Sequence, residues 1–593
     1  MLKNDALHRG IPISVSLKNS LLEEDMQPKA EVSKHRTIVI SAIAVCVAIG
    51  ISFIARFLVY LINVVTGLSF YGSAKAAEAG PAGNHLGLWV ILIPVIGGVI
   101  VGLMALYGSK AIRGHGIPEA METILTNQSK IKPTITYLKP LSSAIAIGTG
   151  GPFGAEGPII ATGGALGSTL GQALKISHNE RKVLLAAGAT AGMAAIFGSP
   201  VAAIFLAIEL LLFEFSPRSI IPVALACITG AAGHHLLFGQ DPVFEIKGII
   251  ASPSNAALFV YSIIGLLMGL LSVATTKIVY FIEDLFEKLP VHWMWWPAIG
   301  AVAVGVVGYF YPRTLGVGYN NITDVLNQQL TLQVILSLFL FKFISWAIAL
   351  GSGTSGGTLA PLMTIGGAAG ALAGMLATHF FPEYQVNIGM AALVGMSAMF
   401  AGASRALLTS IIFALETTGQ SNALLPLLAA CTGSYFVSFF LMENTIMTEK
   451  IARRGIRTPD SYEPDLLSKM SVSAVMKKDG LVLSEENTVE EVREWMQKQE
   501  YAESRYFIVV SEGSEFSGIV QAADLLAFKG ETSLPIQGLI SKKRAFIDRN
   551  DSLKMAVDTM VREKTDVIPV LSEERDIVGL ISINEIFAAY RMK

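Results

Sequence analysis

The chain has 593 residues, of which 52% are hydrophobic and 15% are charged. Its formal net charge of −2 is close to zero, so charge gives no argument for nucleic-acid binding, and no nucleic-acid partner is expected. The part before about residue 450 is much more apolar than the part after it, which disfavours a large soluble protein with buried helices.

The first 36 residues are polar and mixed in charge. They lack the apolar core and the cleavage-like end of a secretory signal. Basic residues stand at both ends of the apolar part: Lys29, Lys34, Arg36, Arg453, Arg454 and Arg457. Because basic residues flank membrane spans on the cytoplasmic side, both termini are predicted to be cytoplasmic, with residues 1–36 as a cytoplasmic N-terminal segment. The expected location is the plasma (cell inner) membrane, crossed several times.

Long apolar stretches lie near residues 37–65, 85–108, 183–213, 219–239, 256–281, 292–310, 332–350, 361–381, 387–415 and 423–442. Several can span a hydrocarbon core of roughly 30 Å, which takes about 20 helical residues. Others are interrupted by Gly or Pro, which is tolerated at membrane depth where the backbone is buried in protein or lines a cavity. We expect a transmembrane domain at 37–455, with halves near 37–240 and 255–450.

Three glycine-rich turns lead into predicted helices: Gly114-His115-Gly116-Ile117-Pro118-Glu119, Gly154-Ala155-Glu156-Gly157-Pro158 and Gly357-Thr358-Leu359-Ala360-Pro361. A helix N-terminus offers unpaired N–H groups and the positive end of the helix dipole. Such turns bind an anion without placing a full positive charge in lipid, and they predict a membrane anion pathway. The alternative is that the glycines serve close helix packing, which we assign to Gly163, Gly164 and Gly167.

The second and third turns belong to a duplication with a constant offset of 203 residues, from Gly148 to Gly351. Glu156 in the first copy corresponds to Leu359 in the second. A carboxylate inside a membrane is costly and is a functional candidate by default. Beside an anion site it would compete for the same N–H groups, so Glu156 is predicted to be a gate that responds to pH. The alternative is a structural glutamate that caps its helix.

A further repeat aligns Pro200–Glu209 with Leu407–Glu416 at equal spacing, and both glutamates are interpreted as mainly structural. The cysteines Cys46, Cys227 and Cys431 lie in apolar segments without a disulfide or metal pattern. No nucleophile with a base, no metal-ligand spacing and no Walker-type loop is present, so no catalytic or metal site and no enzyme activity is expected.

Residues 456–593 are richer in charge, and short Val/Ile runs alternate with helical patterns. Within them, residues 506–526 parallel residues 566–587. Each copy indicates strand, turn, strand and helix after an earlier amphipathic helix. We expect two small α/β modules, at about 466–528 and 535–592, packed together as a cytoplasmic pair. A non-repeating domain is the alternative.

The motifs GHGIPE, GAEGP and GTLAP, in this order, resemble the anion-site motifs of the CLC family of chloride channels and chloride/proton exchangers. The tail resembles the paired CBS (cystathionine-β-synthase) domains of many members. The resemblance implies an all-α polytopic membrane domain, the inverted-repeat CLC fold with broken helices, followed by a small α/β CBS-domain pair. It also implies a homodimer in the lipid bilayer, with one pore per subunit.

The same resemblance implies that Glu156 is the gate and that chloride is the transported ligand, with no cofactor required. The implied anion-binding residues are His115, Gly116, Ile117, Gly154, Ala155, Gly157, Thr358, Leu359 and Met447.

The chain departs from the family pattern at four positions: His115 replaces a serine, Met447 a tyrosine, Leu359 a phenylalanine, and Leu210 the inner proton-transfer glutamate of the exchangers. Two hydroxyl donors to the anion are therefore lost, and His115 is a candidate replacement. We favour a voltage/pH-gated chloride channel or a weakly coupled conductance. A chloride/proton antiporter, with protons as a second partner, is the alternative, and fluoride or nitrate transport is a further one.

CBS pairs often bind adenine nucleotides through a Gly-h-x-Ser/Thr-x-x-Asp segment. The first module has Gln521 in place of the hydroxyl residue and keeps Asp524, whereas the second keeps Ser582 and has Glu585 in place of aspartate. An adenine nucleotide is therefore a candidate ligand at Asp524, Ser582 and Glu585. A membrane-anchored nucleotide sensor is the alternative function, and a tail that only helps to hold the dimer is the structural one.

Overall fold

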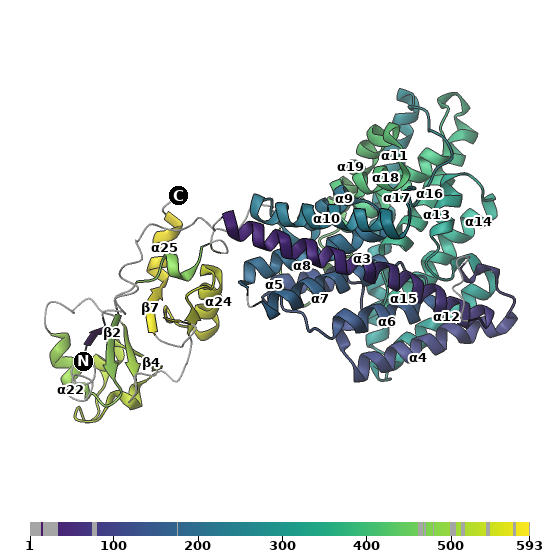
Figure 1. The fold of residues 1–593 in the computed structure, drawn as a ribbon. Coiled ribbons are helices and arrows are strands. Elements are labelled where there is room, and N and C mark those ends of the chain that lie inside the picture. The colour runs from purple at the N-terminus through teal and green to yellow at the C-terminus, as the bar shows by residue number, and fades with distance from the viewer. Residues whose placement is uncertain are drawn as a thin grey trace. The chain divides into compact units, whose positions relative to one another are not determined.

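The computed structural model describes residues 13–15, 34–73, 80–174, 176–459, 467, 470–477, 480–497, 506–511, 516–540, 546–572 and 577–591. The chain divides into two compact units (Figure 1). One unit is His35–Glu463, which is helical. The other combines Met1–Lys34 with Pro464–Lys593 and contains the strands.

The helical unit contains α3 (Lys34–Tyr71), α4 (Leu92–Tyr107), α5 (Ile117–Thr126), α6 (Ile135–Gly148), α7 (Glu156–Ala173), α8 (His178–Phe197), α9 (Pro200–Leu206), the π-helix η4 (Ala207–Leu212), α10 (Pro217–Leu237), α11 (Asn255–Glu287), α12 (Trp296–Phe310), α13 (Tyr319–Leu326), α14 (Leu332–Ser337), the π-helix η7 (Leu338–Lys342), α15 (Phe343–Gly351), α16 (Leu359–Phe380), α17 (Ile388–Ser404), α18 (Leu407–Thr418), α19 (Leu424–Leu441) and α20 (Glu449–Ala452). Among the described residues, eight helical segments are long and apolar enough to cross a membrane.

The helices of the first half recur in the same order in the second half. The corresponding elements are α3 and α11, α4 and α12, α5 and α13, α6 and α14–η7–α15, α7 and α16, α8 and α17, α9–η4 and α18, and α10 and α19. Within each half the chain breaks between two helices. Residues 149–155 separate α6 from α7, and residues 352–358 separate α15 from α16. The second and third glycine turns begin in these breaks and continue into the first turns of α7 and α16.

Two equivalent helices show that the repeat is inverted. The carboxylate of Glu209, in η4, accepts hydrogen bonds from the N–H groups of Leu408 and Thr409 at 2.9 Å each, at the start of α18. Glu416, near the end of α18, accepts in turn from the first turn of α9 at 3.0 and 2.9 Å. Each helix therefore caps the other, and the two run antiparallel. Both glutamates have the structural role that the repeat predicted.

The predicted packing role is confirmed for Gly163 and Gly167 but not for Gly164, where an added Cβ would meet only side-chain atoms at 3.4 Å or more. A Cβ atom on Gly163 of α7 would lie 2.1 Å from the carbonyl oxygen of Gly188 in α8. The equivalent pair in the second half shows the same contact, because a Cβ on Gly366 of α16 would lie 2.6 Å from the carbonyl oxygen of Gly395. Backbone therefore packs directly on backbone in both halves.

The second unit contains the strands β1 (Ile13–Val15), β2 (Gly480–Ser484), β3 (Tyr506–Val510), β4 (Phe516–Gln521), β5 (Ile547–Asp548), β6 (Val567–Leu571) and β7 (Ile577–Ser582), and the helices α22 (Val489–Met496), α23 (Ala522–Ala527), α24 (Leu553–Glu563) and α25 (Ile583–Arg591). The sheet orders are β1-β2-β3-β4 and β5-β6-β7. The strand, turn, strand and helix predicted for each copy correspond to β3, β4 and α23 and to β6, β7 and α25. In both sheets a further strand, β2 or β5, pairs parallel with the first of these strands, and the two predicted strands pair antiparallel.

The two modules of this unit pack on each other through β3. Phe507 and Val509 point into the core of the first module, whereas Ile508 and Val510 pack with Ile577 and Leu580 of the second. Segments are also exchanged. Residues 470–476 join the core of the second module, and residues 536–540 join the core of the first. Each module therefore contains residues from both predicted ranges.

One strand was not anticipated. β1 comes from the N-terminal segment and pairs antiparallel with β2, with Ile13 opposite Val482 and Val15 opposite Gly480. The beginning of the chain thus extends a sheet whose other strands lie beyond residue 479.

Candidate functional site

The three glycine turns meet through their backbones, although they are far apart in the sequence. Gly154 and Gly357 exchange two hydrogen bonds, from Gly154 N to Gly357 O at 3.3 Å and from Gly357 N to Gly154 O at 3.0 Å. The first turn joins them, because Gly114 N donates to Thr354 O at 3.1 Å. The N-termini of α5, α7 and α16 are therefore neighbours.

Glycine is required where these backbones touch. A Cβ on Gly116, which has φ +97°, would lie 2.0 Å from the carbonyl oxygen of Gly157. A Cβ on Gly157 would lie 1.9 Å from the carbonyl oxygen of His115 and 2.9 Å from the Cα of Gly357. No side chain fits between these segments, so backbone N–H groups line the place where the turns meet.

Glu156 lies at this meeting point and is completely buried. It is the first residue of α7, and its carboxylate is folded back over the glycines. A Cβ on Gly154 would lie 1.7 Å from Oε2, and one on Gly357 would lie 2.8 Å from the same oxygen. The backbone N–H of Ala360 in α16 also faces the carboxylate. The only acidic side chain of the duplicated turns thus occupies the position that their N–H groups offer to an anion.

A residue that the sequence reasoning missed completes the contact. The hydroxyl of Tyr319 donates to Glu156 Oε1 at 2.9 Å. Tyr319 is the first residue of α13, the counterpart of α5 in the second half. The signal was present in the sequence, because Gly316-Val-Gly318-Tyr319 follows Gly114-His-Gly116-Ile117 at an offset of 202 residues. It is a fourth glycine turn, without the proline that marked the other three.

The first turn places His115 and Ile117 in buried positions. Nδ1 of His115 is buried and has no hydrogen-bond partner among the described residues. Gly116 is capped by the side chain of Glu119, whose Oε2 accepts from Gly116 N at 2.7 Å. Thr358 is the N-cap of α16, Leu359 is its first residue, and Ala155 is the N-cap of α7. The structure thus brings together the predicted anion-site residues of the three turns.

Two buried lysines, also missed, hold the loops that precede α5 and α13. Lys139 donates to the carbonyl oxygens of Ile112 and Gly114 at 2.7 and 2.9 Å. Lys342, 203 residues later, donates to the carbonyl oxygens of Thr314 and Gly316 at 2.9 and 2.8 Å. In both halves a buried lysine therefore satisfies two backbone carbonyls of the loop.

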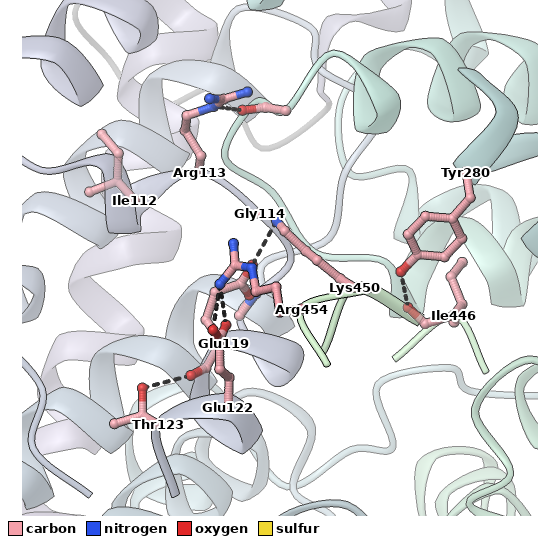
Figure 2. A network of polar contacts seen from close by, with 12 residues as sticks. Ile112, Arg113, Gly114, Glu119, Glu122, Thr123, Tyr280, Ile446, Lys450 and Arg454 are labelled. Atoms are coloured by element: carbon pink, nitrogen blue, oxygen red, sulfur yellow. Dashed lines mark hydrogen bonds and ion pairs between the residues drawn. The ribbon is translucent and has the colours of Figure 1, made fainter. Parts of the chain in front are cut away.

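Figure 2 shows the ion pairs between α5 and the last residues of the helical unit. Lys450 Nζ, in α20, lies 3.4 Å from Glu119 Oε1, and Arg454 Nη1 donates to Glu122 Oε1 at 2.5 Å. On the other side, the hydroxyl of Tyr280 donates to the carbonyl of Ile446 at 2.8 Å.

Met447, the remaining predicted anion-site residue, directly follows Ile446 and is fully buried. Its N–H donates to Thr445 Oγ1 at 3.2 Å. Met447 thus lies on a fixed segment just before α20, which packs on α5.

Leu210 lies in η4 and is buried, with 3% of its surface exposed. The π-helix η4 packs on α5 and α8. An apolar side chain therefore occupies the position that the resemblance assigns to an inner proton-transfer acid.

In the tail, the candidate nucleotide residues of the second module bind each other. Ser582 donates through both its N–H, at 2.9 Å, and its hydroxyl to Glu585 Oε2, and Lys477 lies 3.0 Å from Glu585 Oε1. Burial alone would raise the pKa of Glu585, but the Ser582 hydrogen bonds and the Lys477 ammonium hold it below its ordinary value. Asp524 of the first module is exposed at the start of α23.

Comparison with known proteins agrees with this arrangement. The model of the family described as "Voltage gated chloride channel" matches residues 96–439, and the CBS domain model matches residues 536–591. The H(+)/Cl(-) exchange transporter ClcA of Yersinia pestis bv. Antiqua (strain Angola) is 29% identical over 356 residues, which are 57% of this chain and 72% of that protein. The protein of the same name from Salmonella paratyphi B (strain ATCC BAA-1250 / SPB7) is 28% identical over 379 residues, 60% of this chain and 79% of that protein.

Solved structures share the fold. A slow cyanobacterial Cl−/H+ antiporter aligns with a TM-score of 0.63 at 23% identity, over 71% of this chain and 98% of that one. A eukaryotic CLC transporter aligns with a TM-score of 0.63 at 18% identity, over 93% of this chain and 99% of that one. The predicted fold class, a helical inverted-repeat membrane domain followed by a CBS-domain pair, is confirmed.

Proposed function

Since the chain belongs to the voltage-gated chloride channel family and is a chloride transport protein rather than an enzyme, we propose that Glu156 opens and closes its anion pathway. The observation that carries this proposal is the buried carboxylate of Glu156 on the meeting point of three helix N-termini. The backbone N–H groups that face this carboxylate, those of Glu156 and Ala360, would equally face a chloride ion in its place. The carboxylate and a chloride therefore exclude each other.

Protonation changes this competition. A neutral carboxylic acid gains less than a carboxylate from the positive ends of the helix dipoles, so it leaves its position more readily. An anion that moves into the position of the carboxylate is then stabilised by the same N–H groups. The backbone N–H groups at Thr358 and Leu359 would hold the anion deeper along the path, and the unpartnered Nδ1 of His115 supports a role for that side chain as a further donor.

The test of the gate is the variant Glu156→Gln. Glutamine cannot ionise, so we expect chloride efflux from proteoliposomes to lose its pH dependence and to stay near the level that the parent reaches at acidic pH. The parent itself should respond by at most about tenfold per pH unit, because one proton is bound. Glu214→Gln, a change of a carboxylate near Lys182, is the matched control and should keep the parental profile. A Glu156→Gln protein as pH-sensitive as the parent would contradict the gate.

For coupling, we favour passive or weakly coupled chloride conductance, because Leu210 cannot carry a proton between Glu156 and the cytoplasm. A second candidate, chloride/proton exchange, is supported by relatives named H(+)/Cl(-) exchange transporters and by acids on α5, the helix that packs on η4. The reversal potential in proteoliposomes under a pH gradient separates the two. Conductance predicts a potential set by chloride alone, whereas exchange predicts a clear shift with pH.

The remaining parts of the proposal follow from the family and the fold. We expect a homodimer in the plasma (cell inner) membrane. The pairing of β1 with β2 supports both termini lying on the same, cytoplasmic side. Efflux measured with chloride, nitrate and fluoride in parallel would identify the preferred anion. Adenine nucleotide at the tail is a weaker candidate, because Ser582 and Glu585 already satisfy each other.

A further inference from the structure

We propose that the hydroxyl of Tyr319 is a latch that holds the Glu156 gate closed and then donates to an anion that replaces the carboxylate. The inference rests on the proposed gating function of Glu156. The contact is direct, with Tyr319 Oη 2.9 Å from Glu156 Oε1. It also joins the two halves, because Glu156 begins α7 in the first half and Tyr319 begins α13 in the second.

The latch is held in place independently of the gate. The residue before Tyr319 is Gly318, with φ +77°, which turns the chain into α13. Lys342 donates to the carbonyl oxygens of Thr314 and Gly316 just upstream and so anchors this loop to η7. The Tyr319 hydroxyl therefore stays where it is when the carboxylate moves away.

The ring of Tyr319 is also fixed by its neighbours. It packs edge-on against Phe197 and Phe244, with ring centroids 5.8 and 5.9 Å away. Tyrosine has few torsions, so a ring held on two sides positions its hydroxyl closely. Tyr319 itself is half-buried, with the ring against the core of the helical unit.

The acceptor of its hydroxyl hydrogen bond distinguishes Tyr319 from buried tyrosines of the helical unit. The hydroxyl of Tyr261 lies 3.3 Å from the carbonyl of Asn387, and that of Tyr280 donates to the carbonyl of Ile446. Both of these hydroxyls are therefore paired with backbone carbonyl groups. The Tyr319 hydroxyl instead meets a carboxylate, and a hydrogen bond to an ionised acceptor is roughly twice as strong as one between neutral groups. Its strength therefore depends on the protonation state of Glu156.

The direction of the effect follows. The hydroxyl stabilises the ionised carboxylate in the closed position more than it stabilises the neutral acid. Removing the hydroxyl should make the gate open at higher pH. After opening, the same O–H faces the vacated place and can donate to chloride. This hydroxyl would partly replace the two side-chain hydroxyls that His115 and Met447 do not provide.

The first test compares Tyr319→Phe with Tyr261→Phe, which removes a hydroxyl that is hydrogen-bonded to the backbone of Asn387, away from the site. Chloride efflux from proteoliposomes is measured across pH, after gel filtration and thermal unfolding have shown that each variant is folded. Tyr319→Phe is expected to raise efflux at alkaline pH by the order of tenfold, as loss of one charge-assisted hydrogen bond implies, and to move the pH midpoint upward. Tyr261→Phe should keep the parental curve. A parental pH curve for folded Tyr319→Phe would overturn the latch.

The second test measures the anion directly. Glu156→Ala vacates the carboxylate position, and chloride affinity is then measured by calorimetry with and without Tyr319→Phe. The double variant should bind chloride several-fold to tenfold more weakly. Equal affinities would overturn donation to the anion. Failure of the underlying function looks different. In that case Glu156→Gln keeps its pH dependence, whereas failure of the latch alone leaves Glu156→Gln insensitive to pH and Tyr319→Phe like the parent.

Discussion

Glycine at position 157 is under the strongest steric demand at the site. Its missing Cβ would lie 1.9 Å from the carbonyl oxygen of His115 and 2.9 Å from the Cα of Gly357, so backbone rather than a flexible side chain would have to move. The contacts between the three turns depend on this closeness. A methyl group at residue 157 would therefore separate α5 from α7 at the point where their N–H groups meet.

We predict that Gly157→Ala destabilises the helical unit by at least about 1–3 kcal/mol, the usual cost of overpacking, and abolishes chloride flux. Apparent melting temperature in detergent and efflux from proteoliposomes measure the two effects. Gly164→Ala on the same helix is the control, because its Cβ would meet only Leu185 and Ala189 side chains at 3.4 Å or more. A Gly157→Ala protein as stable and as active as Gly164→Ala would contradict the close contact.

At this scale the sequence identified some residues of the candidate site and not others. Glu156 stood out because the duplication supplied its own comparison, a carboxylate in one copy and Leu359 in the other. Tyr319 did not, because the glycine turn before it lacks the proline that marked the other three turns, and nothing in the sequence shows that its hydroxyl meets Glu156. Only the fold brings it across from the second half to the gate. Lys139 and Lys342 stand at the 203-residue offset of the duplication, but their acceptors are backbone carbonyls, which the sequence does not identify.

Among the helices, the pair formed by α9–η4 and α18 is fixed at both ends by a carboxylate. The Glu209 carboxylate accepts hydrogen bonds from two backbone N–H groups and from the hydroxyl of Thr409, the last at 2.7 Å. The Glu416 carboxylate accepts hydrogen bonds from two backbone N–H groups. Each carboxylate also meets the positive end of a helix dipole. The pair thus connects the two halves of the unit by four charge-assisted backbone bonds, two at each end.

We predict that Glu209→Gln and Glu416→Gln each lower stability by about 1–3 kcal/mol, because an amide oxygen accepts more weakly and its NH2 group faces backbone donors. Apparent melting temperatures in detergent test this. Glu245→Gln, a change of an exposed glutamate, should leave stability within about 0.5 kcal/mol of the parent. Chloride flux per folded protein should persist in all three. If Glu209→Gln and Glu416→Gln melted at the same temperature as Glu245→Gln, the two carboxylates would not stabilise these helices as caps.

Equal spacing in the two copies predicted that α9–η4 and α18 carry equivalent glutamates. It did not predict that each glutamate would cap the other helix, because helix caps are usually sought in the same or the adjacent segment. The exchange between halves requires an antiparallel arrangement, which is a property of the tertiary structure.

On the scale of the whole molecule, the N-terminal strand β1 covers the edge of the tail sheet that β2 would otherwise expose. Its three residues pair with Gly480, Leu481 and Val482. An uncovered edge strand presents a row of unpaired N–H and C=O groups. The N-terminal segment therefore stabilises the tail, and the two ends of the chain form one structural unit.

Deleting residues 1–16 should make the amides of β2 exchange faster with deuterium. The strands β5, β6 and β7, in the sheet that β1 does not touch, serve as the internal control and should keep their protection. Hydrogen–deuterium exchange of the full chain and the truncated chain in detergent, followed by mass spectrometry of peptides, measures this. Unchanged protection of residues 480–484 would show that β1 does not cover the edge in solution.

The fold class of both units was predictable, because apolar stretches, two repeats and the family motifs all pointed to it. The β1 contact was not, since residues 13–15 lie in a polar segment and their partners lie more than 460 residues away. The exchange of residues 470–476 and 536–540 between the tail modules was not predicted from the sequence, for a similar reason. Repeats reveal copies, but they do not show where a chain crosses from one copy to the other.

The reciprocal hydrogen bonds between Gly154 and Gly357 have an evolutionary consequence. The two glycines are the same residue of the duplicated segment, so each copy pairs with its own duplicate across a local twofold relation. A half-length ancestor could have formed this contact only as a pair of identical chains. Such a pair must carry the same residue at both gate positions, and two carboxylates would repel each other over one pair of glycines. Fusion of two such genes would release the copies from this identity and would allow a single mobile charge where symmetry permits only none or two.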